Sequence, residues 1–212
     1  MSLAIALYNH HGIVMSADRL VNATIEGKEF HQSFTEQKLF LVDGKYGLSY
    51  TGTASINNVP TSALIKNYLK ENQSYNSAPE DYLLKTAIHF HSIQSEGQNI
   101  IFIMCGYFCS KRFVISTNTI SPKIKSVPCD TNSITYSGQN DFVKMLTEQD
   151  QTIVFDYGNF TIQDSIDFLR FLNKTVHGLM RFGQIFPTVS ENCDILAIYP
   201  NKSRWVERLT PH

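Results

Sequence analysis

The chain opens with two apolar runs on either side of a short turn-forming segment. Residues 3–8 read LAIALY, residues 9–12 read NHHG and residues 13–17 read IVMSA. Apolar runs of this length around a turn with Asn and Gly are typical of a β-hairpin whose two strands are both largely buried. Residues 38–42 and 46–51 repeat the pattern around Asp-Gly-Lys and predict a second hairpin.

The middle of the chain changes to the spacing of helices. Residues 54–71 and 78–94 carry apolar residues at helical spacing. Ala-Pro-Glu-Asp at 78–81 is a good helix start, because Pro suits the first turn and acidic residues suit the positive end of the helix dipole. Residues 139–148 predict a short helix and residues 162–181 a long one. Further strands are expected at residues 100–108, 112–116, 193–200 and 203–209.

The order of these elements constrains the fold class. Strands first, helices in two separate blocks and strands again do not give the alternating rhythm of a parallel sheet. The order predicts an α+β fold in which one sheet packs on another and the helices lie outside. The polar segment 22–35 is expected to connect the two hairpins. A length of 212 residues fits one layered domain, and no repeat or linker divides residues 1–212.

Composition excludes several classes of partner. Eighteen Lys and Arg against nineteen Asp and Glu leave no overall positive charge for nucleic acid or an anionic membrane. No stretch approaches the roughly 18 apolar residues of a membrane span, and the first residues lack the basic region of a signal peptide. We therefore expect a cytoplasmic protein. The four cysteines form no CxxC pair, so we expect buried reduced thiols, no metal site and no cofactor.

Ser2 directly follows the initiator Met1. Because the second residue is small, we expect methionine aminopeptidase to remove Met1 and to expose Ser2 as the new N-terminus. Its α-amino group, with an ordinary pKa of about 7.7 to 8.0, could then act as a base for the hydroxyl of the same residue. Ser2 is therefore a candidate nucleophile that needs no histidine.

Two charged residues could support this nucleophile. Such a site needs a carboxylate to hold a cation and a lysine that favours deprotonation of the hydroxyl. Asp18 ends the second strand of the first predicted hairpin and so returns beside the strand that Ser2 begins, while Lys38 begins the next hairpin. We expect these three strand ends to converge. An ordinary surface ion pair between Asp18 and Lys38 is the alternative interpretation.

The motifs around these residues resemble those of the proteasome β subunits and their bacterial relative, the HslV peptidase. The likeness lies in the short apolar strand after Ser2, in GIVMSAD at 12–18, in KLFLVD at 38–43 and in YGLSYTGTA at 46–54. The spacing from residue 2 to residue 18 also matches the family's distance from nucleophile to aspartate. The resemblance implies the N-terminal-nucleophile hydrolase fold, a four-layer αββα sandwich of two mostly antiparallel sheets.

Carried over residue by residue, the resemblance implies a set of roles. Ser2 would be nucleophile and base, Asp18 and Lys38 the charged pair, and the backbone N–H of Gly52 an oxyanion donor. The supporting residues beside the N-terminus would be Ser137, Gly138 and Ser190. The substrate would contact Val21, Asn22, Tyr50 and Ala54. Because Tyr50 is bulky, we expect the pocket for the side chain before the scissile bond to be shallow.

Three functional hypotheses follow. The leading one is a threonine-protease-like peptidase or amide hydrolase that acts on a peptide or protein substrate. The resemblance implies a homo-oligomer, possibly a ring, with an ATPase partner left open. A second hypothesis is a catalytically silent scaffold or ring subunit, which is favoured by Pro187 at the position where the family has an aspartate. A third is a small-molecule amidase on the same fold, for which a monomer or dimer would be the discriminating observation.

Overall fold

The computed structural model describes residues 2–25, 28–73, 77–128, 130–148, 154–183 and 185–208, and only the backbone in the parts of 23–29 that it includes. Its main elements are two five-stranded sheets in which all paired strands are antiparallel. The first sheet has the order β12 (Ser133–Gly138), β1 (Leu3–Asn9), β2 (Gly12–Asp18), β13 (Cys193–Tyr199), β14 (Lys202–Glu207). The second has the order β11 (Lys125–Val127), β10 (Lys111–Asn118), β9 (Ile100–Phe108), β6 (Tyr46–Gly52), β5 (Leu39–Val42).

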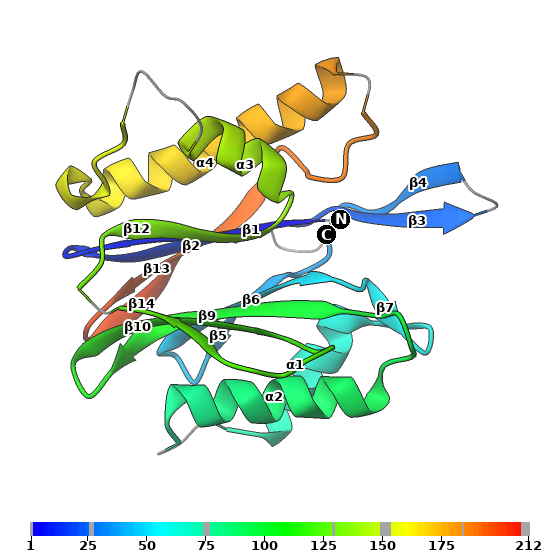
Figure 1. The fold of residues 1–212 in the computed structure, drawn as a ribbon, viewed down its shortest axis with the longest axis horizontal. Coiled ribbons are helices and arrows are strands. Elements are labelled where there is room, and N and C mark those ends of the chain that lie inside the picture. Colours follow the sequence, from blue (N-terminus) through cyan, green and yellow to red (C-terminus); the bar gives the residue numbers. More distant parts are fainter. Residues whose placement is uncertain are drawn as a thin grey trace.

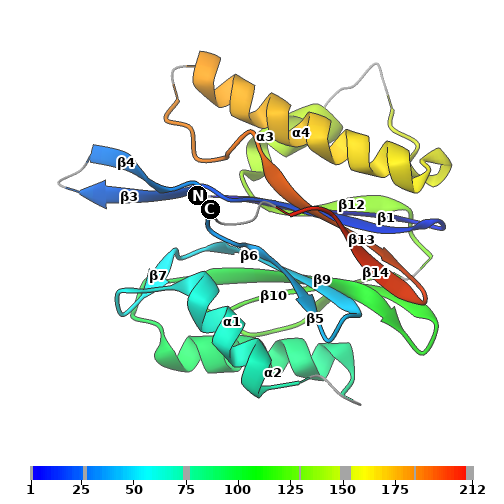
Figure 2. The ribbon, with the colours of Figure 1, turned by 180° about the vertical axis from the view of Figure 1, so that it is seen from behind.

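Helices cover the outer face of each sheet. The first sheet carries α3 (Asn140–Thr147) and α4 (Ile162–Phe182), and the second carries α1 (Thr61–Glu71) and α2 (Pro79–Ile93). Figure 1 and the reverse view in Figure 2 show the resulting order of helices, sheet, sheet and helices. Smaller elements are a 3-10 turn at Tyr157–Asn159, the hairpin β3 (Val21–Ile25) to β4 (Lys28–Ser33) and the hairpin β7 (Ser55–Ile56) to β8 (Val59–Pro60). The predicted α+β class is confirmed.

The alternation of side chains along β1 explains why both faces of the first sheet are covered. Leu3, Ile5 and Leu7 pack into the core beneath α4, while Ala4 and Ala6 pack into the core between the sheets. Successive side chains of a strand point to opposite faces, so a strand that is apolar throughout needs cover on both sides. The small alanines face the second sheet and allow the two sheets to approach.

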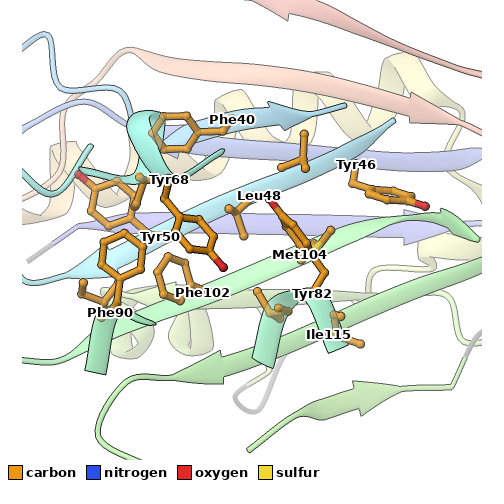
Figure 3. Close-up of a cluster of buried hydrophobic side chains, with 14 of the residues drawn as sticks. Phe40, Tyr46, Leu48, Tyr50, Tyr68, Tyr82, Phe90, Phe102, Met104 and Ile115 are labelled. Carbon is orange, nitrogen blue, oxygen red and sulfur yellow. The ribbon is translucent and has the colours of Figure 1, made fainter. Parts of the chain in front are cut away.

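A cluster of aromatic residues fills the space between the second sheet and its helices. Figure 3 shows rings from β5, β6, β9, α1 and α2 gathered in one core. The rings of Phe90 and Phe102 have centroids 5.6 Å apart, and those of Tyr68 and Phe90 5.9 Å apart, within the range of favourable aromatic pairs. We call the buried residues of this core the aromatic cluster: Phe40, Val42, Tyr46, Leu48, Tyr50, Ile56, Ile65, Tyr68, Tyr82, Leu83, Phe90, Ile100, Phe102, Met104, Phe113 and Ile115.

The long helix α4 has clear signals at its start. The Thr161 side chain accepts a hydrogen bond from the Asp164 amide, and the Asp164 carboxylate accepts one from the Thr161 amide. This reciprocal capping satisfies two amides that have no partner within the helix. In α2, Pro79 lies in the first turn and is followed by Glu80 and Asp81, as expected from the sequence.

Three regions differ from the sequence expectations. The polar segment 22–35, expected to be a connection, contains most of the hairpin formed by β3 and β4. The helix expected from residue 54 begins at Thr61, because β7 and β8 precede it. The short strands β11 and β12 were not expected either, although β12 pairs with β1 over six residues. Among the described residues, no helix has both the length and the apolar character needed to cross a membrane.

Candidate functional site

The carboxylate of Asp18 is buried beside the start of β1. Antiparallel pairing places Ala17 opposite Ala4, so the last residue of β2 lies next to the residues that begin β1. One carboxylate oxygen accepts the amide of Leu3 at 2.8 Å, and the other accepts the amide of Leu20 at 2.9 Å. The backbone that follows Ser2 is thus held directly by Asp18.

Lys38 completes a buried ion pair with this carboxylate. Its Nζ lies 3.2 and 3.1 Å from the two oxygens of Asp18 and also donates a hydrogen bond to the carbonyl of Leu20. The two side chains are 2% and 0% exposed, which excludes the surface ion pair considered from the sequence. The Lys38 carbonyl accepts the amide of Tyr50 at 3.1 Å, which fixes the start of β5 against β6.

Ser2 is itself buried, with 6% of its surface exposed. Its carbonyl accepts a hydrogen bond from the amide of Gln139 at 2.9 Å, and Leu3 pairs with Gly138 of β12. Gly138 has φ +104°, and a Cβ at this position would lie 1.7 Å from the Ser2 carbonyl oxygen. Only glycine allows this close approach, and the pairing of β1 with β12 places Gly138 and its neighbour Ser137 beside the start of β1. Met1 lies outside the described residues.

A short hydrogen bond joins β6 of the second sheet to β12 of the first, near the start of β1. The hydroxyls of Thr51 and Ser137 are 2.5 Å apart and buried. Thr51 immediately precedes Gly52, which ends β6 with φ +104°. A Cβ on Gly52 would lie 2.2 Å from the carbonyl oxygen of Asn99, so the turn that presents the Gly52 backbone also requires glycine.

A second buried ion pair lies next to the first. Arg19 Nε donates to Asp194 at 2.9 Å, and the two side chains are 2% and 0% exposed. The amide of Arg19 donates to the hydroxyl of Ser190 at 3.1 Å, which brings Ser190 beside the residue that follows Asp18. We call the six buried residues around the start of β1 the polar cluster: Asp18, Arg19, Lys38, Thr51, Ser137 and Asp194.

Three members of the polar cluster were not predicted from the sequence. Asp194 and Thr51 were each assigned only to a predicted strand, and Arg19 was given no role. A signal for Asp194 was present, because an acidic residue inside the apolar strand Cys193–Tyr199 must find a partner when buried. The pairing of Arg19 with Asp194 depends on the register of β2 and β13, which the sequence does not reveal.

The expected substrate-binding residues have different environments. Tyr50 is 2% exposed and belongs to the aromatic cluster (Figure 3), and its hydroxyl donates to Glu36 at 3.2 Å. Burial, followed by the nearby Glu36 carboxylate, raises the pKa of Tyr50 well above its ordinary value. Asn22 donates to the carbonyl of Pro187 at 3.2 Å. Val21 is buried, and Ala54 is partly exposed.

A pocket of about 260 Å³ adjoins the polar cluster. It lies between the base of the hairpin formed by β3 and β4, the last turns of α4 and the segment that follows α4. Its lining residues are Leu20, His31, Phe34, His177, Pro187, Ser190, Glu191 and Asn192. Leu20 contacts both Asp18 and Lys38 through its backbone, so one wall of the pocket is shared with the buried ion pair.

Of the cysteines that the structure describes, Cys193 lies beside the polar cluster, opposite Asp18 in the pairing of β13 with β2. Burial raises the pKa of Cys193 to about 12 and that of Cys105 further, which keeps both thiols protonated near neutral pH. Cys109 is exposed, and Cys129 lies outside the described residues. Within the described ranges, no three His, Cys, Asp or Glu side chains are placed to hold a metal ion.

Comparison with known proteins gives a structural match without a sequence match. No protein-family model and no curated protein matches the chain. Among solved structures, a match is the Anbu (Gly-1) mutant from Hyphomicrobium sp. strain MC1, with a TM-score of 0.67 and 15% identity. The alignment covers 98% of this chain and 85% of that chain.

These results correct the family assignment made from the motifs. Membership of the proteasome β and HslV family is wrong, because no family model matches and the Anbu structure is matched at only 15% identity. At 15% identity, the structural likeness is evidence for the fold alone. The chain therefore shares with Anbu a proteasome-like fold.

Proposed function

We propose that this chain is an N-terminal-nucleophile amide hydrolase that uses Ser2 after removal of Met1. The observation that carries the proposal is the buried pair of Asp18 and Lys38, which is bonded to the backbone directly after Ser2. Burying two charges costs several kcal/mol per ion in desolvation, and apolar residues of similar volume would often be as stable. A catalytic role beside Ser2 would explain why Asp18 and Lys38 are buried as an ion pair despite this cost.

The proposed reaction assigns each proton. The α-amine of the processed Ser2 takes the proton of the Ser2 hydroxyl as the oxygen attacks an amide carbonyl. The Gly52 N–H would stabilise the oxyanion, and the α-amine would then give its proton to the leaving amine as the carbon–nitrogen bond breaks. Water attacks the acyl ester next, and its proton passes through the α-amine to the Ser2 oxygen while the carboxylic acid is released.

The charge of Lys38 would assist this cycle. A nearby cation favours the ionised form of a hydroxyl and disfavours the protonated form of an amine. Both effects prepare Ser2 for attack with a neutral α-amine. Asp18 would hold Lys38 in place and, through the Leu3 amide, would hold the chain that bears the nucleophile. In this proposal Asp18 is therefore a positioning residue.

Hydrolysis of short peptides tests the proposal. The native protein, shown by intact mass to lack Met1, would be incubated with internally quenched peptides and with small N-acyl amides. We expect hydrolysis that the Ser2→Ala substitution abolishes and that Ser92→Ala, at an exposed position in α2, leaves unchanged. Activity that survives Ser2→Ala would refute the assignment of the nucleophile.

A catalytically silent scaffold is the second candidate, and two observations favour it. The Nζ of Lys38 has three acceptors within the fold, namely both oxygens of Asp18 and the carbonyl of Leu20, which match its three N–H bonds. Pro187 supplies no carboxylate, and its carbonyl accepts a hydrogen bond from the side-chain amide of Asn22. A protein that keeps Met1 and hydrolyses none of the peptides would support the scaffold.

A further inference from the structure

We infer that the pocket beside Leu20 binds an uncharged aromatic side chain of the substrate, at the residue that follows the scissile bond. This inference rests on the proposed function, because it assigns a subsite to the same centre. Its first support is position. The amide of Leu20 and the amide of Leu3 bond to the two oxygens of one carboxylate, that of Asp18. A group in the pocket would therefore lie close to the backbone next to Ser2.

The walls of the pocket favour an aromatic ring. The ring of His31 is stacked against Phe186 at 4.6 Å between centroids and also contacts Phe34 at 5.2 Å. The hydrogen bond between His31 Nδ1 and the Asn22 side chain, 3.0 Å long, fixes the orientation of the imidazole. Phe34 is 59% exposed, so much of its apolar surface is open to contact with a ligand. Aromatic rings pair favourably in stacked and edge-to-face geometries.

The size of the pocket suits one side chain. An apolar cavity of about 150 Å³ is enough to bind benzene, while pockets for drug-sized ligands span about 300 to 1,000 Å³. The volume of about 260 Å³ lies between these values. The pocket can therefore hold one aromatic side chain and part of its backbone.

The polar residues of the pocket argue against an acidic ligand. Glu191 is the one carboxylate among the lining residues, and it would repel an anionic group. The Nδ1 atom of His177 is 2.8 Å from the carbonyl of Val189 and is therefore held within the protein. Leu20, Phe34 and Pro187 supply apolar walls. The combination matches a neutral aromatic group.

The position of Gly52 indicates which part of the substrate would enter the pocket. In the proposed reaction, the acyl carbonyl lies against the Gly52 backbone, which ends β6 of the second sheet. The pocket lies on the opposite side of the start of β1, where the base of β4 and the segment after α4 form its walls. Figures 1 and 2 show this segment and β6 on opposite sides of the start of β1. The pocket would thus receive the leaving-group side of the substrate.

Binding of leaving-group mimics tests the subsite without any need for hydrolysis. Phenylalanine amide and glycine amide would be titrated into the intact protein while the ring signals of His31 and His177 are followed by NMR. We expect phenylalanine amide to shift both signals, and glycine amide to shift neither. Phe34→Ala should weaken binding at least fivefold. Phe30→Ala, a matched change of an exposed phenylalanine on β4 outside the pocket lining, should not.

Hydrolysis assays then link the pocket to the reaction. Peptides with phenylalanine after the scissile bond should have a kcat/KM about tenfold higher than peptides with glycine, an ordinary size for discrimination by an apolar pocket. Phe34→Ala should remove the preference, and Phe30→Ala should keep it. Hydrolysis without the preference, or without binding of phenylalanine amide, would overturn the subsite and leave the proposed function intact. Binding without reaction at Ser2 would overturn both the proposed function and the role as a subsite.

Discussion

The aromatic cluster and the polar cluster are both shielded from water, but they are built from opposite kinds of residue. The aromatic cluster joins the second sheet to α1 and α2 with apolar and tyrosine side chains (Figure 3). The polar cluster holds two ion pairs and a pair of hydroxyls around the start of β1. Apolar burial is the main source of folding free energy, whereas buried charge gives little net stability. The first region thus explains why the chain folds, and the second needs a functional explanation.

The largest change should come from leaving one charge of the polar cluster without a partner. Asp18→Asn would leave the Lys38 ammonium buried and uncompensated, which should lower the free energy of unfolding by about 3 to 5 kcal/mol. The double variant Asp18→Asn/Lys38→Met removes both charges and should recover most of this loss. Urea unfolding of the two variants would measure the difference. A double variant as unstable as the single one would show that the pair is itself a source of stability.

A smaller loss is expected from a cavity in the aromatic cluster. Leu48→Ala removes a side chain that is 1% exposed and should lower the free energy of unfolding by about 3 kcal/mol. Because Leu48 faces away from Ser2, the folded variant should keep any reactivity of Ser2. Val59→Ala, at a side chain that is 41% exposed, is the control and should change stability by less than about 0.5 kcal/mol. If Leu48→Ala lost reactivity without losing stability, the aromatic cluster would not serve stability alone.

The smallest effect should come from the hydroxyl pair. Thr51→Val keeps the shape of the side chain but leaves the Ser137 hydroxyl without this partner, at an expected cost of about 1 to 2 kcal/mol. Adding Ser137→Ala should return stability close to that of the native protein, since neither hydroxyl then remains. Thermal unfolding of Thr51→Val, Ser137→Ala and the double variant, each compared with the native protein, forms a double-mutant cycle. Additive losses would mean that the two hydroxyls do not depend on each other.

Much of the fold could be predicted from local patterns. The two hairpins at the start of the chain were predicted because their strands are apolar and their turns contain Asn, Asp and Gly, and the structure confirms them. The hairpin of β3 and β4 was missed because residues 28–33 read KEFHQS and are mostly polar, although VNATI at 21–25 does alternate between apolar and polar residues. The start of α1 was misplaced because Asn57 and Asn58 form a tight turn, with φ 51° and 65°, inside a run that also has helical spacing.

The candidate site was less accessible to sequence reasoning. The convergence of Ser2, Asp18 and Lys38 was predicted from strand ends, and the structure places the Asp18 carboxylate against Lys38 and the backbone after Ser2. The contacts that surround this pair join residues far apart in the chain, such as Thr51 with Ser137 and Arg19 with Asp194. Such contacts depend on strand order and register, which local patterns do not determine.

The most direct test of the central claim is the intact mass of the untagged protein before and after exposure to a peptide epoxyketone. This warhead needs both the hydroxyl and the free amine of one N-terminal residue. We predict loss of Met1 and one adduct per chain, absent in Ser2→Ala and retained in Ser92→Ala. A chain that has lost Met1, begins with Ser2 and still gains no mass would contradict the claim that Ser2 is an activated nucleophile.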